Sequence, residues 1–477
     1  MTDHQDRRPI RLGVALIPVI FLIFALVLAI SMYGLSPHLP LICAAAVAGV
    51  VAAFQRIPWQ DVQAGMVHGI HLAMGAILIL MVVGTMIGTW ILGGVVPTMI
   101  FYGLKILSPG IFLVATMLIC SIVSLGTGSS WSTAGTVGLA LIGVGAALGI
   151  PLPMVAGAII SGAYFGDKMS PLSDTTNLAP AVAGTDVFSH IRHMVYTTAP
   201  GFVVALLLYG VIGMRYAGGT LEAQQIGIML DTMEESFFIH PLLLLPPVLV
   251  ILMVVKRIPP LPALFGGMVI GGFCAVAAQS SSLADVAAAA HSGYVSATGV
   301  AEVDDLLTSG GLMSMMETVA LVICAMSFGG IMERTGMLEV IAGSLLKMAK
   351  GTGSLVATTA VSCIGMNAVA SDQYISIVIP GRMYKNAFDK RGLHPKNLSR
   401  VLEDSGTLTS PLIPWNTCGA FMWATLGVYP LAYLPYAFMN LLNPIVSIVF
   451  GFTGITMEKT AEATGRAGAA EEADGSA

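Results

Sequence analysis

Long apolar runs separated by short polar stretches fill most of this 477-residue chain. Because about 20 apolar residues suffice for a helix to cross a lipid bilayer, each long run predicts a membrane-spanning segment. Such runs lie at about 12–32, 39–54, 71–95, 195–214, 239–255, 261–279, 312–332, 401–425 and 429–453, with interrupted regions at 110–165 and 353–380. The pattern predicts an all-α polytopic membrane protein.

Four stretches do not fit the interior of a membrane. Residues 215–236 and 280–311 carry several acidic side chains each, and are predicted to be loops outside the membrane. Residues Trp59 to His68 are predicted to form an amphipathic helix at the interface. The charged tail at 455–477 is predicted to be disordered.

Composition narrows the class of protein further. Hydrophobic residues make up 56% of the chain and charged residues only 10%, whereas soluble domains carry about 25% charged residues. The net charge of −5 leaves no basic surface for nucleic acid. The six cysteines form no Cys-x-x-Cys pair, so neither a disulfide framework nor a zinc site is indicated.

Short sequences recur between the two halves of the chain. Three pairs match in register: Leu113–Thr116 with Leu355–Thr358, Ser129–Ser130 with Ser371–Asp372 at the same spacing, and Ser170–Leu172 with Ser410–Leu412 at nearly that spacing. Internal repeats of this kind predict two related structural units. We place the first at 12–214 and the second at 237–454, joined by an external linker at 215–236.

The distribution of Lys and Arg predicts how the chain crosses the membrane, because cytoplasmic loops carry an excess of both residues. With segment 1–11 and the tail inside, and five crossings per half, every Lys and Arg except Lys105, Lys168 and Arg215 falls on the cytoplasmic side. An odd number of crossings makes the two repeats inverted, an arrangement common in secondary transporters.

Re-entrant hairpins are predicted at 110–149 and 353–380. The apolar arm Phe112–Leu125 would form about 21 Å of helix, which is shorter than a hydrocarbon core of about 30 Å. It leads into the loop-forming sequence Gly126–Gly135, and Asn367–Gln373 interrupts the second half in the same way. Two full crossings in place of each hairpin would give the same topology, so both arrangements remain open.

Two further polar interruptions, at Gly166–Pro180 and Glu403–Thr417, predict broken helices. Unwound backbone persists at membrane depth only inside protein or beside a water-filled cavity, and inverted repeats bring such breaks together near the midplane. Carboxylates, hydroxyls, amides and carbonyls form a hard oxygen site for a small cation. The candidate ion- or substrate-binding residues are Thr127, Ser129, Ser130, Asp167, Ser173, Asp174, Thr175, Asn177, Asn367, Ser371, Asp372, Asp404, Thr409, Asn416 and Thr417.

Three long motifs resemble those of the NhaC family of sodium/proton antiporters. They are Gly166-Asp-Lys-Met-Ser-Pro-Leu-Ser-Asp-Thr-Thr-Asn177, Ala370-Ser-Asp-Gln-Tyr374 with Pro380-Gly-Arg-Met383, and Glu403-Asp-Ser-Gly-Thr-Leu-Thr-Ser-Pro-Leu-Ile-Pro-Trp-Asn-Thr-Cys-Gly419. The similarity extends over about residues 10–455. It implies a transporter rather than an enzyme, in the inner membrane, with hairpins and broken helices, Na+ and H+ as transported ions, no cofactor and a homodimeric assembly.

Within that framework, Asp167, Asp174 and Asp372 are the expected Na+ ligands, and Lys168 is expected to pair with Asp167 or Asp174. Because the family also includes members that resemble exchangers of malate, lactate or amino acids, a Na+- or H+-coupled carrier of a small carboxylate or amino acid remains the alternative. An intramembrane aspartyl protease would need a Gly-x-Gly-Asp signal, which Tyr164-Phe-Gly-Asp167 lacks. A channel is disfavoured because inverted repeats with broken helices favour alternating access.

Overall fold

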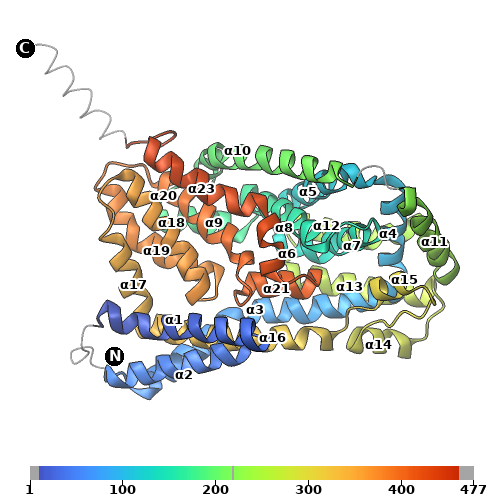
Figure 1. Cartoon of the computed structure of the whole chain (residues 1–477), viewed down its shortest axis with the longest axis horizontal. Coiled ribbons are helices and arrows are strands. Elements are labelled where there is room, and N and C mark those ends of the chain that lie inside the picture. The colour runs from blue at the N-terminus through green and yellow to red at the C-terminus, as the bar shows by residue number, and fades with distance from the viewer. Residues whose placement is uncertain (1–9, 217–219, 461–477) are drawn as a thin grey trace, which may run out of the picture.

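The structure is a computed structural model that describes residues 10–216 and 220–460 (Figure 1). Within these ranges it contains helices and two isolated β-bridges but no strand, which confirms the all-α prediction. Among the described residues, eight helices are long and apolar enough to cross a membrane, or up to ten if each of two bent helix pairs is one span. The predictions for residues 1–9 and 461–477 lie outside the described residues.

The helices follow in chain order. Those of the first half are α1 (Leu12–Val27), α2 (His38–Phe54), α3 (Trp59–Leu92), α4 (Val95–Ile106), α5 (Pro109–Thr127), α6 (Ser130–Thr133), α7 (Leu139–Ala147), α8 (Leu152–Met169), α9 (Asp174–Ala183) and α10 (Val187–Met214). The connection to the second half contains α11 (Thr220–Ser236).

The second half continues with α12 (Leu245–Val255), α13 (Pro260–Ala277), α14 (Leu283–Ser292), α15 (Ala301–Leu307), α16 (Met316–Arg334), α17 (Met337–Leu346), α18 (Thr352–Val369), α19 (Gln373–Asp389), α20 (Pro395–Leu402), α21 (Thr417–Leu426), α22 (Pro430–Tyr433) and α23 (Phe438–Thr453). Short π-helical turns are η1 (Leu28–Met32), η2 (Ala134–Gly138) and η5 (Glu403–Thr407). Short 3₁₀ turns are η3 (Pro241–Leu244), η4 (Leu312–Met315), η6 (Ser410–Leu412) and η7 (Leu434–Tyr436).

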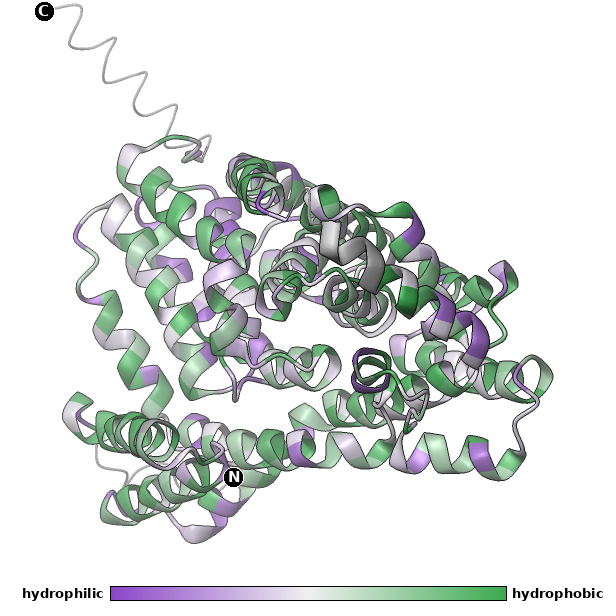
Figure 2. Cartoon of the chain, turned by 45° about the vertical axis from the view of Figure 1, so that its right-hand side comes forward, coloured by the Kyte–Doolittle hydropathy of each residue, from purple (hydrophilic) through white to green (hydrophobic). Residues whose placement is uncertain are grey.

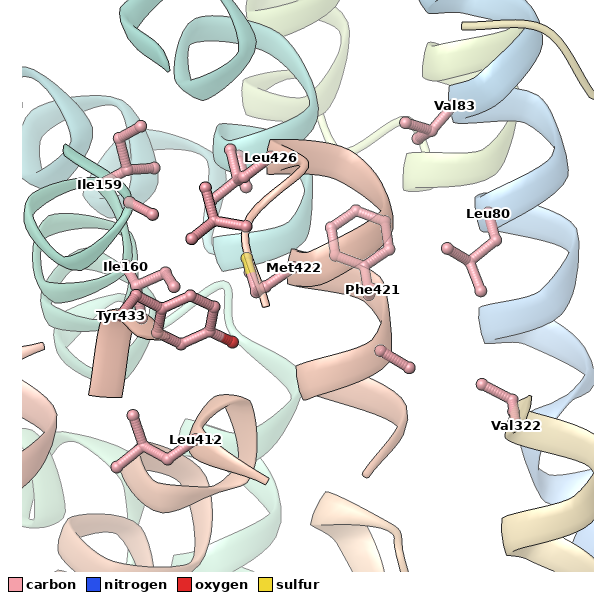
Figure 3. Packing of buried hydrophobic residues seen from close by; sticks show 14 of the residues in the cluster. Leu80, Val83, Ile159, Ile160, Val322, Leu412, Phe421, Met422, Leu426 and Tyr433 are labelled. Carbon is pink, nitrogen blue, oxygen red and sulfur yellow. The ribbon is translucent and has the colours of Figure 1, made fainter. Parts of the chain in front are cut away.

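The helices form two parts, one of which contains the broken helices. Helices α1, α2, α3 and α16 run together along one edge of the molecule, and α10 lies along the opposite edge (Figure 1). Apolar residues cover most of the outer helices, while hydrophilic residues gather at the loops and at a few positions inside the bundle (Figure 2). Helix α21 lies between the two parts, with Phe421 pointing toward Leu80 of α3 and Met422 facing the other way (Figure 3).

Helix α3 is one continuous rod of 34 residues, about 51 Å long at 1.5 Å per residue. Trp59–His68 therefore forms the first turns of α3 and is not a helix of its own, while its position at the interface stays a prediction. Glycines explain the difference, because Gly65 and Gly69 let the first turns of α3 pack directly on the backbone of α16. A Cβ on Gly69 would lie 2.1 Å from the carbonyl oxygen of Met326, and one on Gly65 would lie 2.6 Å from that of Gly330. Small residues at such spacing are typical of close helix pairs in membranes.

The hairpin arms are longer than the sequence suggested. Helix α5 starts at Pro109, at a position where proline suits the first helical turn, and ends at Gly128 in the left-handed conformation. Its 19 residues span about 28 Å, close to the thickness of a hydrocarbon core. The argument from short arms therefore fails for α5, and the choice between a re-entrant hairpin and two crossings stays a prediction.

Residues 455–460 differ from the disordered segment expected there. The carbonyl oxygen of Glu458 accepts hydrogen bonds from the His394 backbone N–H at 2.9 Å and the Asn397 amide at 2.7 Å. The carboxylate of Glu458 pairs with the Lys396 ammonium at 2.5 Å. These contacts, which the tail's own composition does not reveal, hold the end of α23 against the loop before α20.

The close contact between α3 and α16 predicts a difference between two glycines of one helix. Gly69→Ala places a methyl group against the α16 backbone, and overpacking of this kind destabilises by about 1–3 kcal/mol. Gly75→Ala is the control, because nothing lies within 4 Å of a Cβ there. Thermal unfolding in detergent should show a lower Tm for Gly69→Ala and an unchanged or higher Tm for Gly75→Ala. Equal Tm values for the two variants would contradict the packing argument.

Candidate ion-binding site

All four polar interruptions predicted from the sequence reach one cavity of about 800 Å³, called here the site cavity. The hairpin tip between α5 and α6, the break between α8 and α9, the start of α19 and the start of α21 line it on one side. Helix α3 and the α12–α13 connection line it on the other. Its polar lining residues are Thr127, Ser129, Ser130, Asp167, Ser173, Asp174, Thr175, Arg257, Asp372, Gln373, Tyr374 and Thr417.

Asp167 lies near the end of α8 and is 7% exposed. One of its oxygens, Oδ2, accepts hydrogen bonds from the backbone N–H of Ser130 at 3.1 Å and from the Ser130 hydroxyl at 2.6 Å. Ser130 starts α6, so this carboxylate also joins the hairpin tip to the broken helix. Charge-assisted bonds of this kind are among the stronger hydrogen bonds in proteins, and they fix the carboxylate at the wall of the site cavity.

The break after α8 is stabilised by its own hydroxyl groups. The Thr176 hydroxyl donates to the carbonyl oxygens of Asp167 and Lys168, at 3.1 and 2.9 Å, which satisfies the end of α8. The Ser173 side chain caps the start of α9, a typical role for serine. Asp174 is the first residue of α9 and is exposed to the site cavity. Carboxylates therefore stand on both sides of this break.

Asp372 lies at the other hairpin and caps α19, because its Oδ1 accepts a hydrogen bond from the Ile375 N–H at 3.0 Å. The preceding residue, Ser371, has a left-handed φ of 61°. The first hairpin has the same order, with Gly128 at φ 68° followed by the cap Ser129. The expected match of Ser129–Ser130 with Ser371–Asp372 is thus shifted by one residue at this turn, since the α18–α19 connection is one residue longer.

Several candidates in the second half hold the fold and do not line the site cavity. The Asn416 amide donates to the carbonyl and side-chain oxygens of Asn367, both at 3.1 Å. The Asn367 amide in turn donates to the Gly406 carbonyl at 2.6 Å and the Thr409 hydroxyl at 3.0 Å. The carbonyl oxygen of Ser371 accepts a hydrogen bond from the backbone N–H of Thr417 at 3.0 Å. These contacts tie α18, the broken helix after α20 and α21 together.

The Asn177 side chain also forms hydrogen bonds that stabilise the backbone. Its amide donates to the carbonyl oxygens of Pro171 and Ser173, at 2.9 and 2.7 Å, and its side chain lies outside the site cavity. The Asn residues in the motifs thus satisfy freed backbone in both halves.

Lys168 pairs with Asp404, and the expectation that it would pair with Asp167 or Asp174 is wrong. Both side chains are fully buried, and Asp404 Oδ1 also accepts a hydrogen bond from the Thr197 hydroxyl at 3.2 Å. Neither residue lines the site cavity. Lys168 points away from its neighbour Asp167 because successive side chains on a helix face different sides.

The charges that do line the site cavity are mainly negative. Asp167, Asp174 and Asp372 face it, while the one cation among its lining residues, Arg257, is exposed. Within residues 10–216 and 220–460, no three His, Cys, Asp or Glu side chains come together as a metal-binding cluster. The expected Na+ site therefore rests on single carboxylates combined with hydroxyl and carbonyl oxygens, which suit a hard cation.

Two polar residues near the site are not among the predicted candidates. Gln373 follows Asp372, lines the site cavity, and accepts hydrogen bonds from Ser410 and Cys418, both at 2.8 Å. Glu403, adjacent to Asp404, is fully buried and accepts a hydrogen bond from Thr175 at 2.9 Å. The clustering of polar residues in the motifs indicated that these two residues lie near the site. Spacing along the sequence does not show which side chains contact each other.

The buried Lys168–Asp404 pair predicts a stability difference between two ion pairs. Asp404→Asn leaves the Lys168 ammonium without its carboxylate, and breaking a buried pair on one side costs about 3–5 kcal/mol. Glu234→Gln is the control, since the Lys105–Glu234 pair is half exposed at 3.7 Å and such pairs contribute about 0–1 kcal/mol. Thermal unfolding in detergent should show a large loss of stability for Asp404→Asn only. A similar small effect in both variants would contradict the assignment.

Known proteins resemble this chain over most of its length. A model described as the Na+/H+ antiporter family matches residues 162–455. The chain is 43% identical over 426 residues to the Na(+)/H(+) antiporter NhaC of Alkalihalophilus pseudofirmus, which covers 89% of this chain and 91% of that protein.

Two further relatives carry different names. The Malate-2H(+)/Na(+)-lactate antiporter of Bacillus subtilis is 38% identical, covering 83% of this chain and 85% of that protein. The Arginine/ornithine antiporter ArcD of Halobacterium salinarum is 38% identical, covering 95% and 94%. These matches over most of the chain confirm the resemblance found in the motifs, and the protein is a member of the Na+/H+ antiporter family.

Proposed function

We propose that this protein exchanges Na+ for H+ across the membrane. The observation that carries the proposal is the site cavity itself, in which Asp167, Asp174 and Asp372 face one space formed by the polar breaks of both halves. Relatives named as Na+/H+ antiporters support the same function.

Competition between the two ions follows from the chemistry of a carboxylate. Taking an ionised carboxylate out of water is unfavourable, and either a bound cation or a bound proton offsets that cost. Asp167 is nearly buried and has Ser130 as a neutral hydrogen-bond partner, so its charge is available to Na+, and a proton bound at a carboxyl group close by competes with that Na+ because the two carry like charge. Exchange results if the protein changes the open face of the site only when Na+ or H+ is bound.

Alternating access is supported by a second cavity. It has a volume of about 530 Å³ and is lined by Ala424 to Gly427 at the end of α21, together with Glu302 and Asp305. The site cavity touches the opposite end of α21 at Thr417 and Cys418. Between them, Phe421 of α21 stacks on Trp131 at a centroid distance of 4.1 Å. A movement of α21 relative to α3 would close one cavity and open the other.

The membrane arrangement is part of this proposal. We place both termini in the cytoplasm, with the acidic segments 215–236 and 280–311 outside and the halves 12–214 and 237–454 as inverted repeats. The location is the inner membrane, the surrounding partner is the lipid bilayer, and the assembly is a homodimer.

The alternative is coupled exchange of a small carboxylate or amino acid, as the names of two relatives indicate for those proteins. The volume of the site cavity is larger than a single ion requires. However, Lys168, the only intramembrane cation that sequence analysis offered for binding a carboxylate substrate, is buried against Asp404. The acidic lining therefore favours Na+ over an anion such as malate or lactate.

Removing the charge of single carboxylates tests the site. We expect Asp167→Asn, Asp174→Asn and Asp372→Asn each to reduce Na+-driven proton flux in proteoliposomes, most strongly for buried Asp167, because each variant lacks one group that a cation or proton can neutralise. Glu235→Gln is the control, since Glu235 is exposed on α11. Near-normal flux in all three site variants would reject the assignment.

A substrate panel tests the alternative. Wild-type proteoliposomes with a proton-sensitive dye inside are exposed in turn to Na+, Li+, malate, lactate, arginine and ornithine. We expect proton flux with Na+, because the site cavity is acidic, and none with malate or lactate alone. Proton flux that requires an organic substrate would instead support the coupled carrier.

A further inference from the structure

Glu403 is a buried carboxyl group directly behind the wall of the site cavity. It is the first residue of the π-helical turn η5 and is 0% exposed. Its Oε1 accepts a hydrogen bond from the Thr175 hydroxyl at 2.9 Å. Its other oxygen, Oε2, is buried and has no hydrogen-bond partner in the part of the chain that the structure describes.

Glu403 has no cation of its own. The neighbouring ammonium of Lys168 is held by Asp404, and among the described residues no Lys, Arg or His lies within ion-pair distance of Glu403. The titratable groups that interact with it from the packed elements are Asp167 and Lys168 at the end of α8, and the buried Arg400 of α20 interacts with the adjacent Asp404. A buried carboxylate without a counter-ion is strongly unfavourable, so the protonated carboxyl is the stable form in this conformation.

Thr175 connects Glu403 to the site cavity. It is 3% exposed and lines that cavity, and its hydroxyl lies 3.2 Å from the hydroxyl of Ser173, which also lines it. A threonine hydroxyl donates one hydrogen bond and accepts others, so it can pass a proton while it stays in place. The Thr175 hydroxyl is therefore the single group between the Glu403 carboxyl and the site cavity.

Resting on the proposed Na+/H+ exchange, we propose that Glu403 carries the transported proton and that Thr175 relays it, while Asp167 and its cavity neighbours hold Na+. For uptake, a cavity hydronium gives a proton to the Thr175 oxygen as the original Thr175 hydroxyl proton moves to Glu403 Oε1. The products are water and a neutral carboxyl. For release, the carboxyl proton moves to Thr175, and the Thr175 proton moves to cavity water.

The two carboxyl groups differ in ways that suit these two tasks. Asp167 accepts two hydrogen bonds at its Oδ2 and faces the site cavity, where a cation can reach it. Glu403 lies behind the cavity wall with one hydrogen bond. Environments that separate two neighbouring carboxyl groups in this way commonly assign them different roles.

The test compares two activities of the same reconstituted protein. Glu403→Gln should lower Na+-driven proton flux by about tenfold or more, while the exchange of radioactive Na+ for unlabelled Na+ stays within about twofold of wild type. Glu339→Gln is the control, because Glu339 is an exposed glutamate on α17, and both of its activities should match wild type. Near-normal proton flux in Glu403→Gln, or loss of both activities in a protein that remains folded, would overturn the proposal.

Thr175 provides a second test that does not depend on how Glu403→Gln folds. Thr175→Val keeps the shape of the side chain and removes the hydroxyl, so Na+-driven proton flux should fall. Thr175→Ser keeps the hydroxyl and should restore proton flux. Equal proton flux in the Val and Ser variants would overturn the relay.

The two proposals fail in different ways. If wild-type protein shows no coupling of Na+ to H+, the proposed function fails. If wild-type protein couples the two ions and Glu403→Gln couples them equally well, only this inference fails.

Discussion

Every polar group inside a membrane needs a partner, because no water is present there to supply one. This constraint explains why the broken helices of this protein come with so many buried hydrogen bonds. Asn367 and Asn416 satisfy each other and the backbone of the second break, and Thr176 satisfies the first. Once the backbone is satisfied by such residues, the remaining oxygens at the breaks are free to face an ion.

The two halves of the chain contribute differently to the site cavity. In the first half, the hairpin tip and the break expose Ser129, Asp167 and Asp174 to the site cavity. In the second half, most of the corresponding polar residues bind one another, and Asp372 with its neighbours reaches the cavity from the start of α19. The first half therefore supplies most of the acidic groups that face the site cavity, and the second half mainly holds the breaks in place.

Polarity at membrane depth was enough to predict that Asp167 and Asp372 reach one cavity, because a charged residue between two apolar arms has few structural explanations. It was not enough to find the partner of Lys168. Asp404 lies 236 residues away along the chain, and nothing local distinguishes it from Asp167 or Asp174, which are much closer in sequence. The continuous helix α3 was missed for a similar reason, since its first turns are stabilised by Gly330 and Met326 of α16 and not by their own pattern.

Glu403 and Asp404 show how adjacent carboxyl groups acquire different properties. The Lys168 ammonium contacts Asp404, and the buried Arg400 guanidinium also interacts with Asp404. Glu403 forms no ion pair among the described residues, and a buried carboxylate without one is strongly unfavourable, which is the reason for the proposal that Glu403 carries a proton. Both residues belong to a π-helical turn, a feature often found at functional sites because it departs from regular helical spacing. That turn directs Glu403 to Thr175, which lines the site cavity, and Asp404 to Lys168.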